Sequence, residues 1–351
     1  MEATLKNRLL CLGMKAPDEL KEGRKWGAGP AGGRYLLVHD SVTNVPIFGF
    51  AEDSPIHLLE RDDKHYVSDG GKETKVDLLD NPRFYDAPTS DGVRMRMIAL
   101  AHGNRCLGST VYQRCVRWEM GDQCKFCGIE LSLKHGMTME VKKPHHLAEV
   151  AEAAEGEGFD HITLTTGTAN LRDKGSRMLS SVTRAVKDNA RMGVHVQIEP
   201  VSKEEIESMH SAGADSIGIH IESLDRKTLE RVCPGKAGDY DVYFEAWENA
   251  LDVFGPNQVS SYVILGLGED RIETLAGIDK MCEAGVIPFV VPLRPLDETP
   301  LRDSIPPRPE VMEEFYSYAC DSMKEHGINP AKNLAGCVRC GGCSALMDYY
   351  R

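Results

Sequence analysis

Short apolar runs alternate with amphipathic stretches over most of the chain from about residue 93 onward. Each apolar run is continuous, which is typical of a strand that is buried on both faces of a parallel sheet. We predict such strands just before Cys115 and at 162–165, 194–198, 216–221, 260–265 and 289–293. The stretches between them repeat apolar residues at helical spacing, which predicts helices at 145–155, 176–190, 203–211, 240–253 and 271–284.

This alternation predicts an α/β fold, because parallel strands are joined by right-handed crossovers through helices. About six repeats indicate a partial or complete parallel βα barrel, whose ligands are expected at the carboxyl ends of the strands. We assign the barrel to 93–305, an N-terminal β-rich cap to 1–92, and a C-terminal helix with a cysteine-rich tail to 306–351. The glycine-rich run at 27–33 lacks the Lys-Ser/Thr pair of a phosphate loop and is predicted to be a plain turn.

Composition narrows the class of protein. The 351 residues include 41 Lys and Arg against 54 Asp and Glu, a net charge of −13, and 41% are hydrophobic. The apolar content excludes a disordered chain, and no apolar run approaches the roughly 18 residues of a membrane span. The N-terminus shows no signal peptide, and the acidic balance argues against nucleic-acid or anionic-membrane binding. We therefore expect a cytoplasmic protein that binds neither nucleic acid nor a membrane.

The chain contains eleven cysteines, and two clusters stand out. A disulfide framework suits a short exported domain, so clustered thiols here indicate a metal or catalytic site. The first cluster is Cys115, Cys124 and Cys127. Three thiolates from one loop can hold three irons of a 4Fe-4S cluster and leave the fourth iron open to a ligand. Structural zinc and buried, unliganded thiols are the alternatives.

The second cluster lies in the glycine-rich tail and has the spacing Cys-x2-Cys-x2-Cys. Its members are Cys337, Cys340 and Cys343. Runs of this kind bind three irons and take the fourth ligand from elsewhere. We predict an auxiliary iron–sulfur cluster, with zinc as the alternative. The candidates for its fourth ligand are Cys11, Cys233 and Ser344.

The Cys-Lys-Phe-Cys run at 124–127 resembles the Cys-x-aromatic-Cys signature of the radical S-adenosyl-L-methionine (SAM) enzymes. In that family the preceding cysteine is separated by three residues, whereas eight residues separate Cys115 from Cys124. Cys106 is the second candidate for this first ligand. The resemblance implies a SAM-binding 4Fe-4S cluster on Cys115, Cys124 and Cys127, with Phe126 beside SAM.

Further motifs follow the order of the same family's barrel. Thr166, Gly167 and Thr168 follow a predicted strand and resemble the turn that holds the amino group of SAM. The run at 263–269 resembles the fifth-strand motif near the adenine, and it contains Gly266 and Gly268. A tight strand-to-helix turn is the structural alternative for this second motif.

Three charged residues end predicted strands, where a barrel presents them to ligands. Glu199 and Glu222 could bind ribose hydroxyls or an amino group, and each could instead cap the following helix. Arg294 could bind the SAM carboxylate or a substrate acid through its guanidinium.

Histidines are weaker candidates. Three strand histidines are candidates for proton transfer, although such residues are more often packed and hydrogen-bonded. They are His102, His195 and His220. The pair His145 and His146 is predicted to begin a helix at the surface.

The runs at 219–224, 231–235 and 292–301 are similar to lipoyl and biotin synthases. The Gly-Ala-Gly-Pro run at 27–30 and the tail at 336–346 resemble a nitrilase-cluster-associated radical SAM family, related to the second protein of the split archaeal lipoyl synthase. The resemblance implies sulfur insertion at an unactivated carbon of a protein-bound octanoyl group. It also implies three partners: a reductant such as ferredoxin or flavodoxin, a second radical SAM protein and an octanoylated lipoyl domain.

Two other functions stay open. One is a radical SAM enzyme that acts on a small nitrogen-containing metabolite in a nitrilase-linked pathway. The other, from a different class, is a non-catalytic interaction protein stabilised by zinc.

Overall fold

A computed structural model of the chain describes residues 2–21, 25 and 32–350. Most of the turn predicted at 27–33, including the Gly-Ala-Gly-Pro run at 27–30, lies outside these described residues.

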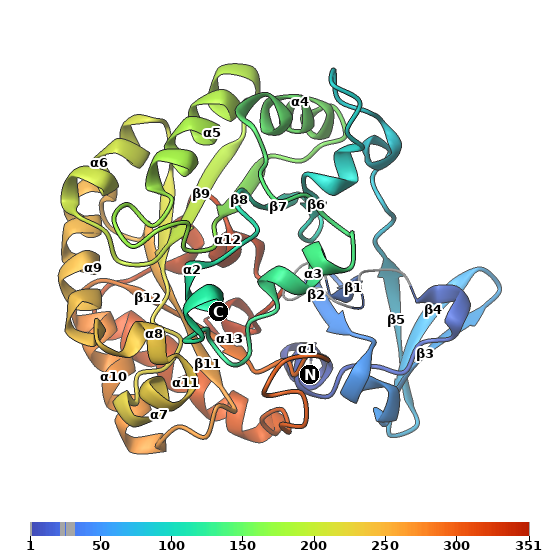
Figure 1. Cartoon of the computed structure of the whole chain (residues 1–351). Coiled ribbons are helices and arrows are strands. Elements are labelled where there is room, and N and C mark those ends of the chain that lie inside the picture. The colour runs from blue at the N-terminus through green and yellow to red at the C-terminus, as the bar shows by residue number, and fades with distance from the viewer. Residues whose placement is uncertain (1, 22–24, 26–31, 351) are drawn as a thin grey trace.

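A seven-stranded sheet organises the larger part of the chain, in the order β12-β11-β10-β9-β8-β7-β6. The strands from β7 to β12 are parallel to their neighbours, and β6 is antiparallel to β7. The order is linear, so the curved sheet is a partial barrel, and the predicted α/β fold is confirmed (Figure 1). The strands are β6 Leu100–Ala101, β7 Cys106–Thr110, β8 His161–Thr165, β9 Gly193–Ile198, β10 Ser216–Ile219, β11 Val259–Leu265 and β12 Ile287–Pro292.

Helices cover the outer face of this sheet, as Figure 1 shows for α4, α5, α6, α9 and α10. α5 buries Leu179, Val182 and Val186, which recur at helical spacing on one face. α6 begins after Ser202, whose hydroxyl accepts the backbone N–H of Glu205 as a helix cap. The covering helices are α4 Pro144–Glu155, α5 Ser176–Asn189, α6 Lys203–Ser211, α9 Tyr240–Phe254, α10 Arg271–Glu283 and α11 Pro309–Glu325. Shorter helices lie in the connections: α2 Val116–Met120, α3 Ile129–Lys134, α7 Arg226–Val232 and α8 Pro234–Ala237.

A second, antiparallel sheet precedes the barrel, with five strands in the order β2-β1-β5-β4-β3. The helix α1 Glu2–Leu12, which the sequence did not predict, packs against β2 and α11. The sheet has a small core of its own that includes Leu36, Val45 and Ile56. Its strands are β1 Gly33–Val38, β2 Ser41–Pro46, β3 Ile56–Arg61, β4 Lys64–Asp69 and β5 Lys72–Leu78.

The C-terminal tail, with α12 Cys337–Cys340 and α13 Leu346–Tyr349, crosses the amino ends of the barrel strands. The N–H of Gly336 donates to Nδ1 of His161, the first residue of β8, at 3.0 Å. The hydroxyl of Ser216, the first residue of β10, donates to the carbonyl of Ala335 at 3.0 Å. The tail therefore closes the end of the barrel opposite to the carboxyl strand ends.

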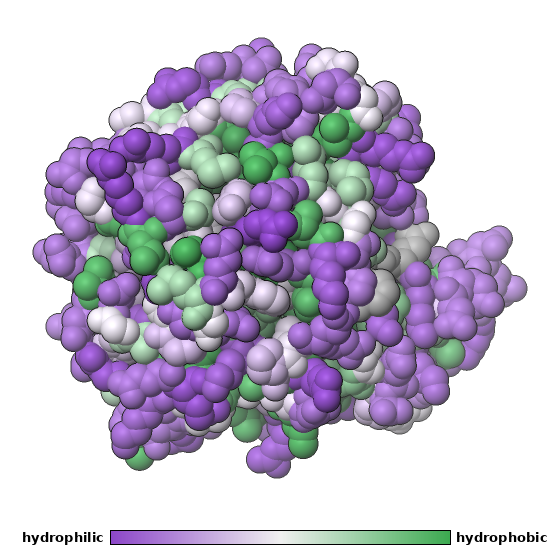
Figure 2. All heavy atoms as spheres, viewed as in Figure 1, coloured by the Kyte–Doolittle hydropathy of each residue, from purple (hydrophilic) through white to green (hydrophobic). Residues whose placement is uncertain are grey.

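Polar and charged residues dominate the rim of the face in Figure 2, and hydrophobic residues form patches nearer its centre. Among the described residues, no helix combines the length and the apolar character that a membrane crossing requires.

Candidate functional site

The connection after β7 carries Cys115, Cys124 and Cys127, whose thiols are all free. The N–H of Cys127 donates to the carbonyl of Cys124 at 3.0 Å, and that of Lys125 donates to the carbonyl of Val232 at 2.9 Å. Desolvation raises the pKa of Cys127 to about 12, assisted by the charges of Cys124 and Cys115. The three thiols therefore lie on one loop, which is anchored to the end of α7.

The predicted SAM-binding turn packs directly against this cysteine loop. The N–H of Gly167 donates to the carbonyl of Tyr112, and the N–H of Val116 donates to the carbonyl of Thr168, both at 2.9 Å. A Cβ atom on Gly167 would lie 1.9 Å from the carbonyl oxygen of Arg114. Only glycine permits this close approach of the two backbones. The structure thus brings two motifs together that are about forty residues apart in the sequence.

Glu199 lies between this turn and a group of cations. Its Oε1 accepts a hydrogen bond from the hydroxyl of Thr168 at 2.5 Å. Its Oε2 lies 3.2 Å from Nη2 of Arg117 and 3.8 Å from Nζ of Lys174. Desolvation alone would raise the pKa of Glu199, but Lys236 and these partners lower it. The carboxylate is therefore stabilised in its charged form, which can bind a polar ligand.

Glu222, on the next strand end, has the opposite pKa shift. It is buried, and its backbone has φ 71°, a conformation that is costly for a residue with a side chain. Desolvation raises the pKa of Glu222, although Nζ of Lys236 lies 3.0 Å from its Oε1. Strained backbone of this kind often marks a functional position.

The predicted adenine motif forms a tight turn after β11. Gly266 and Gly268 have φ values of 98° and 86°, which favour glycine. Nη2 of Arg231 donates to the carbonyl of Leu267 at 2.5 Å, and this hydrogen bond stabilises the turn. This geometry agrees with the structural alternative for the motif, and the adenine contact stays a prediction.

The tail cysteines receive hydrogen bonds from uncharged side chains. The hydroxyl of Tyr262 donates to Sγ of Cys337 at 2.9 Å, and Nε2 of Gln197 donates to the same sulfur at 3.3 Å. The side-chain amide of Asn44, from the N-terminal sheet, donates to Sγ of Cys343 at 3.9 Å. These donors are suited to sulfur that carries negative charge.

One cavity of about 390 Å³ connects the two cysteine clusters inside the barrel. Cys127 lines it from the carboxyl strand ends, and Cys337 and Cys343 line it from the tail. Much of the wall between them is apolar, with Met97, Ile98, Leu100, Ile264, Leu293 and Leu296. Polar side chains are as numerous in the lining but form less of its surface, and they include Glu222, Lys142 and Arg294. A long apolar substrate with few polar groups fits such a lining.

Phe126 and Arg294 take different places in this cavity. Phe126 lines it beside Cys127. Arg294 donates from Nη2 to the carbonyl of Asn44 at 2.8 Å, and its charge acts on the thiol of Cys343. Arg294 therefore lies beside the tail cysteines, a position that favours a substrate acid over the SAM carboxylate among its two predicted ligands.

His102 and His195 are buried, as the packed alternative predicts, and His220 is half-buried. Burial lowers the pKa of His102 to about 4 and that of His195 to about 3, and it lowers the pKa of His220 as well. Nδ1 of His220 accepts the N–H of Tyr262 at 3.1 Å, so Nε2 carries the proton. Among the described residues that Nε2 has no hydrogen-bond partner. His220 lines the cavity and can therefore donate a hydrogen bond to a ligand there.

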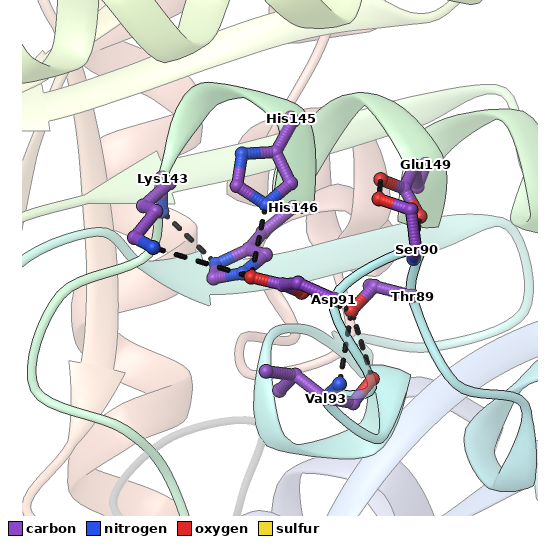
Figure 3. Close-up of polar contacts among 8 residues, drawn as sticks. All are labelled: Thr89, Ser90, Asp91, Val93, Lys143, His145, His146 and Glu149. Carbon is purple, nitrogen blue, oxygen red and sulfur yellow. Dashed lines mark hydrogen bonds and ion pairs between the residues drawn. The ribbon is translucent and has the colours of Figure 1, made fainter.

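A group of polar residues away from the cysteines has the composition of a metal site (Figure 3). One ligand atom each of Asp91, His145 and His146 lie within 4.8 Å of one another. His145 is exposed and His146 is buried, so the predicted surface helix start applies to His145 alone.

The hydrogen bonds of this group argue against a metal. Nδ1 of His146 accepts the backbone N–H of Lys143 at 3.2 Å, so its proton is on Nε2. That Nε2 lies 3.0 Å from Oδ2 of Asp91 and donates to it, whereas a metal needs an unprotonated nitrogen. We interpret the group as a contact that fixes the start of α4 to the loop before it.

Two single cysteines each lie beside the other cluster from the one for which the sequence made them candidates. Cys233, a candidate for the tail cluster, forms a hydrogen bond with Cys124 of the first cluster. Cys106, a candidate for the first cluster, forms a hydrogen bond with Cys340 of the tail. Lys236 forms an ion pair with Glu222 beside the first cluster. No sequence motif indicated this lysine, because only the fold brings α8 to the carboxyl ends of the strands.

Residues 119–285 match the Radical SAM superfamily. Over 229 residues the chain is 21% identical to bacteriochlorophyllide c C-7(1)-hydroxylase from Chlorobaculum limnaeum, which covers 59% of this chain and 57% of that protein. Over 169 residues it is 26% identical to the mitochondrial lipoyl synthase of Picea sitchensis, which covers 46% and 42%. The chain thus matches about half the length of these curated relatives. The structure of methylornithine synthase has a TM-score of 0.50 at 16% identity and covers 62% of each chain.

The fold, the cysteine loop and the family match agree, and the chain carries a radical SAM domain. This family implies a 4Fe-4S cluster and SAM. The residues present fit both groups: three free thiols lie on one loop, and the charged Glu199 and the strained Glu222 lie at the neighbouring strand ends. The two curated relatives carry different activities in their names, so the particular reaction does not follow from them.

Proposed function

We propose that this radical SAM protein inserts sulfur at an unactivated carbon, as one component of a two-protein lipoyl synthase that acts on a protein-bound octanoyl group. The observation that carries the proposal is the cavity that Cys127 lines from one end and Cys337 and Cys343 line from the other. A carbon held there would lie between the source of the radical and a source of sulfur.

Cys115, Cys124 and Cys127 would hold the first cluster, which would supply one electron to SAM and so give methionine and a 5′-deoxyadenosyl radical. For each sulfur gained, the substrate carbon would give one hydrogen atom to that radical, with 5′-deoxyadenosine as the product. Cys337, Cys340 and Cys343 would hold the tail cluster, whose sulfide would form the C–S bond and whose iron would take up the electron released.

The chain's own residues orient the reactants and exclude water. Thr168 and Glu199 would hold the polar end of SAM at the carboxyl strand ends. The apolar cavity wall would align an alkyl chain and keep water from the radical. Glu222 and His220 would contribute polar contacts to the substrate inside the cavity.

The similarity to a plant lipoyl synthase supports this choice of reaction over a small nitrogen-containing substrate. The large apolar part of the cavity surface supports it independently, because a small polar metabolite would leave that part unmatched. We propose as partners a ferredoxin or flavodoxin, a second radical SAM protein and an octanoylated lipoyl domain. The tail site would then be an auxiliary 4Fe-4S cluster on Cys337, Cys340 and Cys343.

The test combines anaerobically reconstituted protein, a chemical reductant, SAM and an octanoylated lipoyl domain, with and without a second radical SAM protein. We expect 5′-deoxyadenosine together with a lipoyl-domain product that has gained sulfur, both measured by mass spectrometry. The control replaces all three tail cysteines by alanine, which should preserve some deoxyadenosine and remove the sulfur gain. Deoxyadenosine without sulfur gain in both reactions of the wild-type protein would overturn the proposal in favour of another radical reaction.

A further inference from the structure

Cys106, the first residue of β7, is buried inside the barrel among the tail cysteines. Its thiol forms a hydrogen bond with the thiol of Cys340. The hydroxyl of Thr163, on the neighbouring strand, lies 3.8 Å from Sγ of Cys106 and 4.0 Å from Sγ of Cys337. Cys106 thus contacts the thiol of Cys340 directly and approaches the thiol of Cys337 through Thr163. More than two hundred residues separate Cys106 from these two cysteines in the sequence.

His102 connects the same group of thiols from a second direction. Its Nδ1 lies 3.9 Å from Sγ of Cys106, and its Nε2 lies 3.6 Å from Sγ of Cys343. Its backbone carbonyl accepts a hydrogen bond from the thiol of Cys340 at 2.9 Å. One residue therefore contacts three thiols, which come from β7 and from both sides of the tail turn.

We propose that Cys106 is the fourth ligand of the tail cluster and completes a four-cysteine site with Cys337, Cys340 and Cys343. The inference rests on the tail cluster of the proposed function and names the residue that closes it. A Cys-x2-Cys-x2-Cys run leaves one iron for a remote ligand, and a thiolate is the usual one. A protein that fills all four positions holds a closed cluster, unlike the first site, where three thiolates leave one iron for SAM.

The other candidates for the fourth ligand make contacts elsewhere. The thiol of Cys11 donates to Oδ1 of Asn7 at 3.4 Å, and that of Cys233 forms a hydrogen bond with Cys124. The hydroxyl of Ser344 donates to the carbonyl of Val290 at 2.5 Å. Ser344 is next to Cys343, but its oxygen points to β12.

His102 and zinc are the two chemical competitors. His102 could offer a ring nitrogen in place of the Cys106 thiolate, since it contacts the thiols on both sides. Tetrahedral zinc would hold sulfurs about 3.8 Å apart, from a Zn–S bond of about 2.3 Å. An iron–sulfur cluster holds its ligand sulfurs farther apart, and measuring zinc together with iron separates the two.

The test uses full-length protein in which Cys115, Cys124 and Cys127 are replaced by alanine, so that any remaining cluster belongs to the tail. After anaerobic reconstitution, iron, zinc and sulfide are measured together with the electron paramagnetic resonance and Mössbauer spectra. We expect about four irons in this background. Adding Cys106→Ala should reduce the iron to about three or fewer and give the spectrum of a three-iron cluster, and Cys106→Ser should alter the spectrum of the cluster that remains.

The matched control is Cys282→Ala, which removes another buried thiol from α10. It should leave iron content and spectra unchanged, and circular dichroism checks that each variant is folded. Four irons with an unchanged spectrum in folded Cys106→Ala would overturn the assignment, and loss of iron in His102→Gln alone would transfer it to His102.

Iron content and the cluster spectra do not depend on the proposed sulfur insertion, so the ligand assignment and the proposed function can fail separately. A Cys106-dependent cluster together with a failed octanoyl assay would overturn the proposed function and support the ligand. A background protein that binds no iron, or that binds zinc instead, would overturn the tail cluster and with it the role of Cys106.

Discussion

The two cysteine clusters have the same number of consecutive ligands but very different surroundings. Around the first, Glu199 is paired with Arg117 and Lys174, and Glu222 is paired with Lys236. Around the second, the hydrogen bonds of the thiols involve uncharged groups of Tyr262, Gln197, Asn44 and His102, and the charges of Arg294 and Lys6 act on Cys343. Paired carboxylates and cations at the first site favour a charged ligand such as SAM, whereas the neutral hydrogen-bond donors at the second are suited to stabilising sulfur.

Their positions differ as well. The first cluster lies on a loop at the carboxyl strand ends, where βα barrels bind ligands. The tail cluster enters from the amino ends, beneath the same cavity. In the proposed function, one end of the barrel would generate the radical and the other would supply the sulfur.

The largest expected effect comes from removing each cysteine triplet in turn. Replacing Cys115, Cys124 and Cys127 by alanine should abolish deoxyadenosine formation, because SAM then has no iron to bind. Replacing the tail triplet should leave deoxyadenosine within about tenfold of wild type, a change of about 1.4 kcal/mol in barrier. Each change should remove about four irons. Iron analysis and product quantification check both, and loss of all iron in either variant would contradict two separate clusters.

A smaller effect is expected from one glycine at each site. A Cβ on Gly167 would meet the carbonyl of Arg114 at 1.9 Å, and one on Gly336, which has φ 84°, would meet the His195 ring at 2.2 Å. Each glycine-to-alanine change should cost about 1–3 kcal/mol of stability through overpacking. Gly167→Ala should lower iron at the first site, and Gly336→Ala should lower iron at the tail.

Gly238→Ala is the control for this pair, because a Cβ there has no neighbour within 4 Å and φ is −62°. Thermal unfolding and site-resolved iron analysis measure the three variants. If both glycine variants lost iron equally from both sites, the two ends of the barrel would not be structurally independent.

The smallest expected effect concerns the charge around the first site. The pKa of Glu199 is lowered in the folded protein, so its charge stabilises the fold above its ordinary pKa of 4.5, and this contribution is lost as pH falls through the folded pKa. Glu199→Gln should therefore cost about 1–3 kcal/mol at pH 7 by leaving Arg117 and Lys174 poorly paired, and less at pH 4. Urea unfolding at both pH values measures the difference.

Asp241→Asn provides the control at the surface, because Asp241 pairs with Arg226 while its side chain is 82% exposed. Such a pair should contribute little at either pH. A cost of Glu199→Gln that did not shrink on acidification would show that the glutamate acts through packing rather than through its charge.

Local pattern determined much of this protein. The runs rich in apolar residues at 194–198 and 260–265 form β9 and β11 within about a residue, because strands buried on both faces are rich in apolar side chains. Cysteine spacing likewise indicated two thiol clusters, since ligands of one metal centre within a loop must be close in sequence. The α1 helix had no comparable signal, and it is amphipathic only weakly and packs through tertiary contacts.

The tertiary structure alone decided which distant residues join each cluster. Cys106 and Cys233 are single cysteines whose flanking sequence gives no partner, and parallel strands bring together residues that are far apart along the chain. The pairing of β7 with β8 puts Cys106 beside Thr163, and the tail that crosses the amino ends puts Cys337 beside the same threonine. The sequence by itself therefore determined the kind of chemistry and the loops that carry it, and the sheet determined how the two clusters share one cavity.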